Sequence, residues 1–232
     1  ELKEARRRLA YEEIFYFILN SRLQESTSVS VENRLSLKDN NVFESTLKKL
    51  PFKLTKGQYE ALTDVRNDLK GPYVSQRLIQ GDVGSGKTMV AFLAILEVIS
   101  NGYQAAIMAP TEVLATQHYE TFCKYCREFN LDIPVVLFTG SMKASLRKSM
   151  QEIVDTNDSV FIIGTHALIS EKTSFKNLGL VICDEQHRFG VAQREALSKK
   201  GIDPHLVVMS ATPIPRTLAM IRDGNMHVSH IK

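Results

Sequence analysis

The 232-residue chain is long enough for one large domain or for one domain with an appendage, and 44% of its residues are hydrophobic, enough for a packed core. Its 29 basic and 26 acidic side chains leave a net charge of only +3, so charge alone does not indicate nucleic-acid binding. The three cysteines form no disulfide framework, and neither a signal-peptide pattern nor a membrane-spanning apolar run of about 20 residues is present, so we expect a soluble cytoplasmic protein.

The N-terminal part of the chain is predicted to be helical and then irregular. Apolar residues recur at helical spacing over residues 1–24, and residues 25–40 are polar, as is typical of a loop. A short helix over residues 41–49 should end before Pro51, because the residue that precedes a proline is pushed away from helical angles.

From residue 77 onward, short apolar runs alternate with stretches of helical character. The predicted strands are residues 77–80, 104–109, 134–138, 159–163, 178–183 and 205–209, and the predicted helices are 87–100, 112–129, 142–154, 190–199 and 214–222. Most of the runs are continuously apolar, as expected of parallel strands that helices cover on both faces. The pattern predicts a three-layer α/β domain with a mostly parallel sheet.

A glycine-rich sequence lies between the first predicted strand and the helix that follows it. The sequence is Gly81-Asp82-Val83-Gly84-Ser85-Gly86-Lys87-Thr88. Its spacing satisfies G-x-x-x-x-G-K-[ST], in which glycines let backbone N–H groups approach phosphate oxygens. We expect Lys87 to neutralise the β- and γ-phosphates of ATP and the Thr88 hydroxyl to bind Mg²⁺. A chance glycine-rich turn is the alternative.

Two adjacent carboxylates follow the apolar strand over residues 178–183. Ligands of such sheets gather outside the carboxyl ends of the strands, so Asp184 is expected to face Lys87 and Thr88 and to bind Mg²⁺. Glu185 is the candidate that polarises the water attacking the γ-phosphate. The alternative for an isolated Asp-Glu pair is a solvated loop.

The cysteines, histidines and aromatic residues elsewhere in the chain are predicted to pack in the core or lie at the surface, and not to bind metal. Cys123 and Cys126 form a C-x-x-C on a predicted helix, but a zinc site needs four ligands at suitable spacing. Three scattered histidines (His118, His166 and His205) show no metal-ligand spacing, and the aromatic residues Phe122, Tyr125 and Phe129 are at the helical spacing of a core.

Taken together, these motifs resemble superfamily 2 helicases, and the sequence around them is similar to the RecG branched-DNA helicases from about residue 51 to residue 220. The resemblance is carried by the motifs at residues 52–58, 81–88, 109–118, 164–168, 184–191 and 210–218. It implies a RecA-like fold, ATP and Mg²⁺ as cofactors, and a bacterial, nucleoid-associated protein.

The resemblance also implies roles for individual residues. Those for adenine binding are Phe52, Leu54 and Gln58; those near the nucleic-acid backbone are Pro110, Thr111 and Thr165; those for coupling are Gln186, His187, Ser210 and Thr212. The strand that ends at Ser210 would lie between the phosphate-loop strand and the Asp184 strand. Two alternatives stay open, since Thr165 could only cap the following helix and Gln58 could be a polar surface residue.

The domain organisation follows from the same resemblance. Residues 1–50 are expected to be a helical connector after a wedge domain, residues 51–225 the first RecA-like domain, and residues 226–232 the start of a linker to a second RecA-like domain. Both other domains would lie outside the chain. The expected partners are therefore these two domains and branched DNA, such as forks and Holliday junctions, and the chain alone is expected to be inactive.

Two other functions remain as alternatives. The transcription-repair coupling translocases have a similar pattern but usually carry a glutamate where Gln186 stands. A P-loop enzyme that acts on a small molecule would need a substrate pocket and lid arginines after the phosphate loop.

Overall fold

The computed structural model describes residues 31–184, 203–211 and 226–231, together with the isolated positions 8, 11, 12, 15 and 196. The helices predicted over residues 1–24, 190–199 and 214–222 lie almost wholly outside these residues. The predicted short helix after the N-terminal loop is confirmed as α2 (Asn41–Lys49), whose first turn is capped by the side chain of Asn40.

Seven parallel strands form a single sheet in the order β3-β4-β2-β5-β6-β1-β7. The strands are β1 (Gln76–Gly81), β2 (Gln104–Met108), β3 (Val135–Phe138), β4 (Phe161–Gly164), β5 (Leu178–Asp184), β6 (His205–Ser210) and β7 (Met226–Ile231). The first six confirm the predicted strands. Strand β6 lies between β1 and β5, as the resemblance implied.

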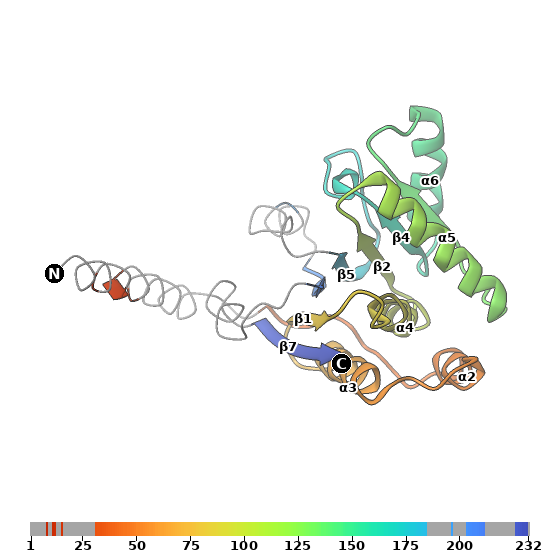
Figure 1. The fold of residues 1–232 in the computed structure, drawn as a ribbon. Coiled ribbons are helices and arrows are strands. Elements are labelled where there is room, and N and C mark those ends of the chain that lie inside the picture. The colour runs from red at the N-terminus through yellow and green to blue at the C-terminus, as the bar shows by residue number, and fades with distance from the viewer. Residues whose placement is uncertain are drawn as a thin grey trace.

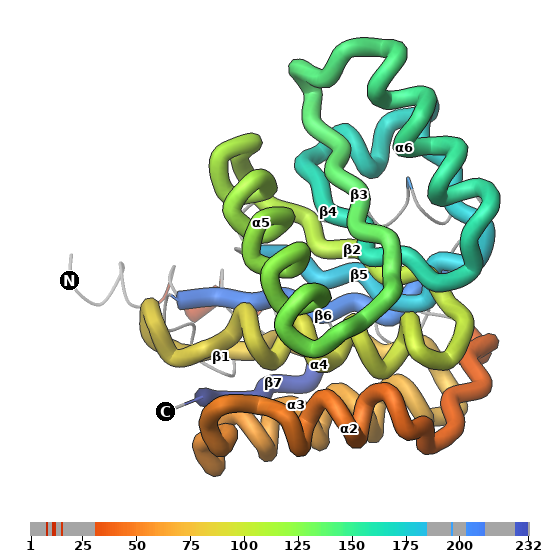
Figure 2. Tube along the Cα trace, turned by 90° about the vertical axis from the view of Figure 1, so that its right-hand side faces the viewer, coloured from red at the N-terminus to blue at the C-terminus, as the bar shows by residue number. Residues whose placement is uncertain are grey.

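Helices cover both faces of this sheet (Figure 1). On one face lie α3 (Lys56–Leu69), α4 (Lys87–Ile99) and α5 (Glu112–Glu128), with α2 alongside α3 and α4 (Figure 2). On the other face lie α6 (Ala144–Thr156) and the short 3-10 helix η1 (His166–Leu168). The three-layer α/β architecture is therefore confirmed.

Most of the strands are largely apolar because their side chains enter two different cores. Leu78 packs into the core under α6 and its neighbour Ile79 into the core under α4, since successive side chains of a strand point to opposite faces. The ring of Phe92 on α4 stacks on that of Phe161 on β4, with 5.4 Å between centroids. Phe122 of α5 packs edge-on against both rings, as its helical spacing predicted.

Strand β7 corrects one predicted domain boundary. Residues 226–232 were expected to begin a linker, but residues 226–231 pair with β1 at the edge of the sheet. Met226 and Ile231 enter opposite cores, and the Ser229 hydroxyl accepts a hydrogen bond from the buried Arg77 guanidinium at 2.8 Å. Only three of its six residues are apolar and two of the others are exposed, so no continuous apolar run marks this strand in the sequence.

The other predicted boundary, between residues 50 and 51, coincides with no break in packing. Phe43 of α2 is fully buried in the same core as α4, and Arg66 of α3 lies over its ring. Helix α2 is therefore part of the same folded body as α3 and α4. None of the described helices combines the length and apolar character needed to cross a membrane.

Candidate functional site

The glycine-rich loop connects β1 to α4, as predicted. Gly84 and Gly86 have φ angles of +81° and +84°, a backbone region that residues with a Cβ rarely adopt. A Cβ on Gly81 would lie only 2.8 Å from the carbonyl oxygen of Ile231 on β7, so this position also requires glycine. The loop conformation therefore depends on its glycines and on the neighbouring edge strand.

The Lys87 side chain folds over this loop from the first turn of α4. Its ammonium group donates hydrogen bonds to the carbonyl oxygens of Gly81 and Asp82, at 2.7 and 2.8 Å. Partial burial lowers the pKa of Lys87, and the nearby carboxylates of Asp184 and Asp82 oppose this effect. Lys87 thus lies in the electrostatic field of Asp184, although the two residues are far apart in sequence.

Asp184 is the last residue of β5 and lies at the same sheet edge as the loop. It pairs with Met209 of β6, which in turn pairs with Ile79 of β1, two residues before the loop begins. Since all three strands are parallel, their carboxyl ends meet there. An ammonium, a carboxylate and the half-buried Thr88 are therefore gathered around one loop.

Two observations test whether the loop fits a polyphosphate. The Ser85 hydroxyl is buried, and no hydrogen-bond partner is found for it among the described residues. The same loop has the glycine conformations that expose backbone N–H groups, and the N-terminus of α4 adds its partial positive charge. An unpaired hydroxyl beside an ammonium group and a helix N-terminus suits the oxygens of a nucleotide phosphate.

Gln58 connects the predicted adenine motif to the loop. Its side-chain amide donates a hydrogen bond to the Ser85 carbonyl oxygen at 2.7 Å, while its amide oxygen accepts from the backbone N–H of Thr55. The Gln58 backbone N–H donates in turn to the Thr55 hydroxyl, so Thr55 and Gln58 form a capping box at the start of α3, a helix that was not predicted from the sequence. Gln58 is therefore a loop contact, not an isolated surface residue.

The remaining predicted nucleotide contacts differ in exposure. Val83 at the tip of the loop is 90% exposed, and Phe52 is 47% exposed. Leu54, in contrast, is partly buried and packs against the core under α4. The exposed positions are accessible to a ligand, whereas Leu54 also has a structural contact.

The predicted nucleic-acid residues follow neighbouring strands. Pro110 and Thr111 lie two and three residues after the end of β2, and Thr165 comes directly after β4, its neighbour in the sheet. The exposed Thr111 caps α5, its hydroxyl accepting from the N–H of Leu114. Thr165 is only 9% exposed and caps η1, which agrees with the capping alternative, although a hydroxyl that accepts can still donate.

Part of the predicted coupling group is not described. Ser210 ends β6, and the strand register brings it level with Gln80 of β1. Glu185, Gln186, His187 and Thr212 lie outside the described residues.

The structure adds a contact that sequence reasoning missed. His118 of α5 is 7% exposed, and its Nε2 lies 2.7 Å from Oδ2 of Asp184. Its spacing matches no metal site, so the sequence alone predicts no role for it. The available signal was its place in the motif at residues 109–118, on the helix that follows the strand next to β5.

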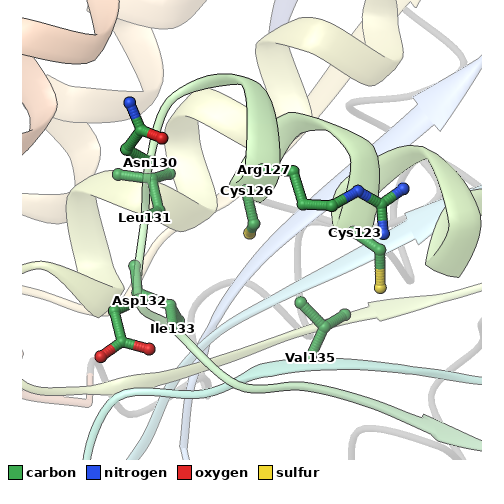
Figure 3. A pocket seen from close by; sticks show the side chains of 8 residues that line it. All are labelled: Cys123, Cys126, Arg127, Asn130, Leu131, Asp132, Ile133 and Val135. Atoms are coloured by element: carbon green, nitrogen blue, oxygen red, sulfur yellow. The ribbon is translucent and has the colours of Figure 1, made fainter.

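A surface pocket of about 540 Å³ lies away from this site (Figure 3). It is formed by the C-terminal end of α5 and the start of β3, and includes Cys123, Cys126 and Arg127. Burial raises the pKa of Cys126 to about 12, so its thiol stays protonated. Among the described residues, no group of three or more metal-ligating side chains is found there or elsewhere.

Comparisons with known proteins agree with this geometry. Residues 55–221 match the family model described as DEAD/DEAH box helicase. The chain is 45% identical over 227 residues to the ATP-dependent DNA helicase RecG of Aquifex aeolicus, covering 97% of this chain and 28% of that protein. RecG of Bacillus subtilis is 44% identical, with 99% and 34% covered.

A solved structure gives the same result. The structure of RecG bound to a three-way DNA junction superposes with a TM-score of 0.79 at 40% identity, over 100% of this chain and 31% of that one. The chain thus spans about a third of the length of the curated relatives it matches. These matches favour the RecG type over the translocase alternative. The chain, with its RecA-like fold, belongs to the DEAD/DEAH box helicase family, and the relatives that it resembles over its whole length are RecG helicases.

Proposed function

We propose that this chain is the ATP-binding motor domain of an ATP-dependent DNA helicase that remodels branched DNA, such as stalled forks and Holliday junctions. The observation that carries the proposal is the convergence of Lys87 and Asp184 at the carboxyl ends of the strands. There the Asp184 carboxylate raises the pKa of Lys87 and so favours its charged form. The similarity to RecG, which is described in complex with a three-way DNA junction, supports the choice of substrate.

In this proposal the loop from Gly81 to Gly86 holds the phosphates of ATP through its backbone N–H groups. Lys87 exchanges its two carbonyl contacts for phosphate oxygens, and Thr88 and Asp184 hold Mg²⁺. Bound Mg²⁺ would supply charge neutralisation at the phosphates. Glu185 would polarise the water that attacks the γ-phosphate.

Adenine is proposed to lie against Phe52, Leu54 and Gln58. The contact between Gln58 and the loop supports this role, because it joins the adenine motif to the phosphate site through a single side chain. A base that engages Gln58 would therefore also affect the loop backbone at Ser85.

The nucleic-acid backbone is proposed to cross the ends of β2 and β4, near Pro110, Thr111 and Thr165. Hydroxyl groups at strand ends suit phosphate oxygens without reading bases. Coupling to ATP is assigned to Gln186, His187, Ser210 and Thr212. A second RecA-like domain and a wedge domain of the same full-length protein would complete the motor, in the bacterial cytoplasm near the nucleoid.

The proposal is tested by ATP turnover of the full-length protein on branched and linear duplex DNA. We expect branched DNA to stimulate turnover more than linear DNA, and Lys87→Ala to lower it roughly 100-fold or more, because a charge-stabilising donor is lost. Lys124→Ala is the matched control, since Lys124 is an exposed lysine of α5 paired only with Glu128 among the described residues. Equal loss in both variants would contradict the assignment of Lys87.

A second comparison separates the two carboxylates. Asp184→Asn and Glu185→Gln should both abolish hydrolysis, but only Asp184→Asn should weaken Mg²⁺ binding, because only Asp184 is proposed as a metal ligand. Isothermal titration of Mg²⁺ with a non-hydrolysable ATP analogue gives the two affinities. Equal affinities would refute this division of roles.

A further inference from the structure

His118 of α5 contacts Asp184, the last residue of β5, which the proposed function assigns as a metal ligand. The Nε2 to Oδ2 distance of 2.7 Å is that of a strong hydrogen bond. A carboxylate only accepts hydrogen bonds, so Nε2 carries the hydrogen and His118 donates. Among the described residues, the Asp184 side chain accepts one hydrogen bond, at Oδ2 from the His118 imidazole.

The imidazole is held rigidly in this position. His118 is nearly buried on the inner face of α5, and its ring packs edge-on against Phe122, with 6.4 Å between centroids. Phe122 in turn packs against Phe92 and Phe161 in the centre of the core. The donor is therefore fixed by aromatic packing, and it can restrict the carboxylate to one orientation.

Helix α5 also connects this contact to the proposed nucleic-acid residues. Thr111 caps its N-terminus at the proposed nucleic-acid edge, and His118 follows seven residues later, about 10 Å along the helix axis at 1.5 Å per residue. One rigid element thus extends from the strand-end loop after β2 to the carboxylate at the end of β5.

The geometry points to His118 as a positioning residue for metal-nucleotide binding. By donating to Oδ2 it orients the Asp184 carboxylate, so that the remaining carboxylate oxygen is presented to the metal site. This inference rests on the proposed function, since it takes Asp184 to be a Mg²⁺ ligand.

The test uses the full-length protein with Mn²⁺ as the probe. Binding of Mn²⁺ in the presence of a non-hydrolysable ATP analogue is followed by the electron paramagnetic resonance signal of free Mn²⁺. His118→Phe keeps the aromatic packing but loses the donor, and we expect about a 10-fold weaker Mn²⁺ affinity, as for other residues that orient metal ligands. His118→Gln keeps an N–H at a similar distance and should bind Mn²⁺ nearly as well as the parent.

Steady-state turnover gives a second readout. In His118→Phe the Mg²⁺ concentration for half-maximal turnover should rise by about the same factor, and excess Mg²⁺ should restore the rate. A purely structural defect would lower the rate without this recovery, and that result would overturn the inference. So would an unchanged Mn²⁺ affinity in His118→Phe.

The variant Asp184→Asn distinguishes failure of the His118 role from failure of the proposed metal role of Asp184. If Asp184→Asn weakens Mn²⁺ binding and His118→Phe does not, only the role of His118 is wrong. If neither variant changes Mn²⁺ binding, the metal role of Asp184 in the proposed function fails as well.

Discussion

At the scale of single residues, His205 shows how burial selects a protonation state. It is 2% exposed at the start of β6, where Nδ1 accepts from the backbone N–H of Ser75 and Nε2 lies 3.0 Å from Oδ1 of Asn33. Burial lowers the pKa of His205 to about 4, partly opposed by Asp68. The imidazole is therefore neutral in the folded protein over the physiological range.

This shift predicts a loss of stability in mild acid. Between pH 6.5 and 4 the unfolded chain binds a proton at His205 that the folded chain does not, so the free energy of unfolding falls as the pH falls. At roughly 1.4 kcal/mol per pH unit, the contribution lost by pH 5 is about 2 kcal/mol. Urea unfolding at pH 7 and pH 5 measures it.

The control for this effect is His205→Gln. Glutamine can replace both hydrogen bonds but does not titrate, so the variant should lose less stability than the parent between pH 7 and pH 5. An identical loss in the two proteins would assign the acid sensitivity to other groups.

At the scale of elements, the phosphate loop depends on contacts from three parts of the chain. Strand β7 approaches Gly81, the capping box of α3 brings Gln58 to Ser85, and the start of α4 brings Lys87 over the loop. The loop conformation is thus set by its own glycines together with elements that precede and follow it in sequence.

Two glycines with the same φ of +84° separate these effects. A Cβ on Gly86 would collide with the side-chain amide of Gln58, whereas a Cβ on Gly102 would meet nothing within 4 Å. Both Gly86→Ala and Gly102→Ala should cost about 1 kcal/mol of stability through the left-handed backbone. Only Gly86→Ala should displace Gln58 and weaken nucleotide binding.

Fluorescence titration with a labelled ATP analogue, alongside thermal unfolding, distinguishes the two variants. If Gly102→Ala reduced nucleotide affinity as much as Gly86→Ala, general destabilisation would explain the loss. The contact between Gln58 and the loop would then make no contribution to nucleotide affinity.

At the scale of the whole molecule, the candidate site lies at the carboxyl ends of the strands of a single sheet. Superfamily 2 motors hydrolyse ATP between two RecA-like domains, as the resemblance implies, and an arginine supplied across such a cleft is worth about 10³–10⁵ in rate. We expect residues 1–232 produced alone to turn over ATP at least about 10³-fold more slowly than the full-length protein on branched DNA. Phosphate release measures this difference.

Nucleotide binding by residues 1–232 is the internal control. Weak but measurable binding with negligible hydrolysis would agree with the proposed need for an arginine from a second RecA-like domain. Robust DNA-stimulated turnover by these residues alone would show that the catalytic groups have been assigned wrongly.

The sequence by itself determined the layered fold, the six strands β1 to β6 and the phosphate loop. Buried parallel strands require continuous apolar runs, and a phosphate loop requires glycines at a set spacing. The position of Asp184 could also be anticipated, because the carboxyl ends of parallel strands share an edge. These features are encoded locally, within a few residues of where they are seen.

Only the tertiary structure decided which further distant residues contact the site. The partnership of His118 with Asp184, the contact of Gln58 with Ser85, and the pairing of β7 with β1 join residues between 27 and 150 positions apart in the sequence. No local pattern marks such pairs, because a histidine on a helix or a polar edge strand has the same sequence signature whatever it packs against. Their positions follow from the strand order, which the packing of the whole chain selects.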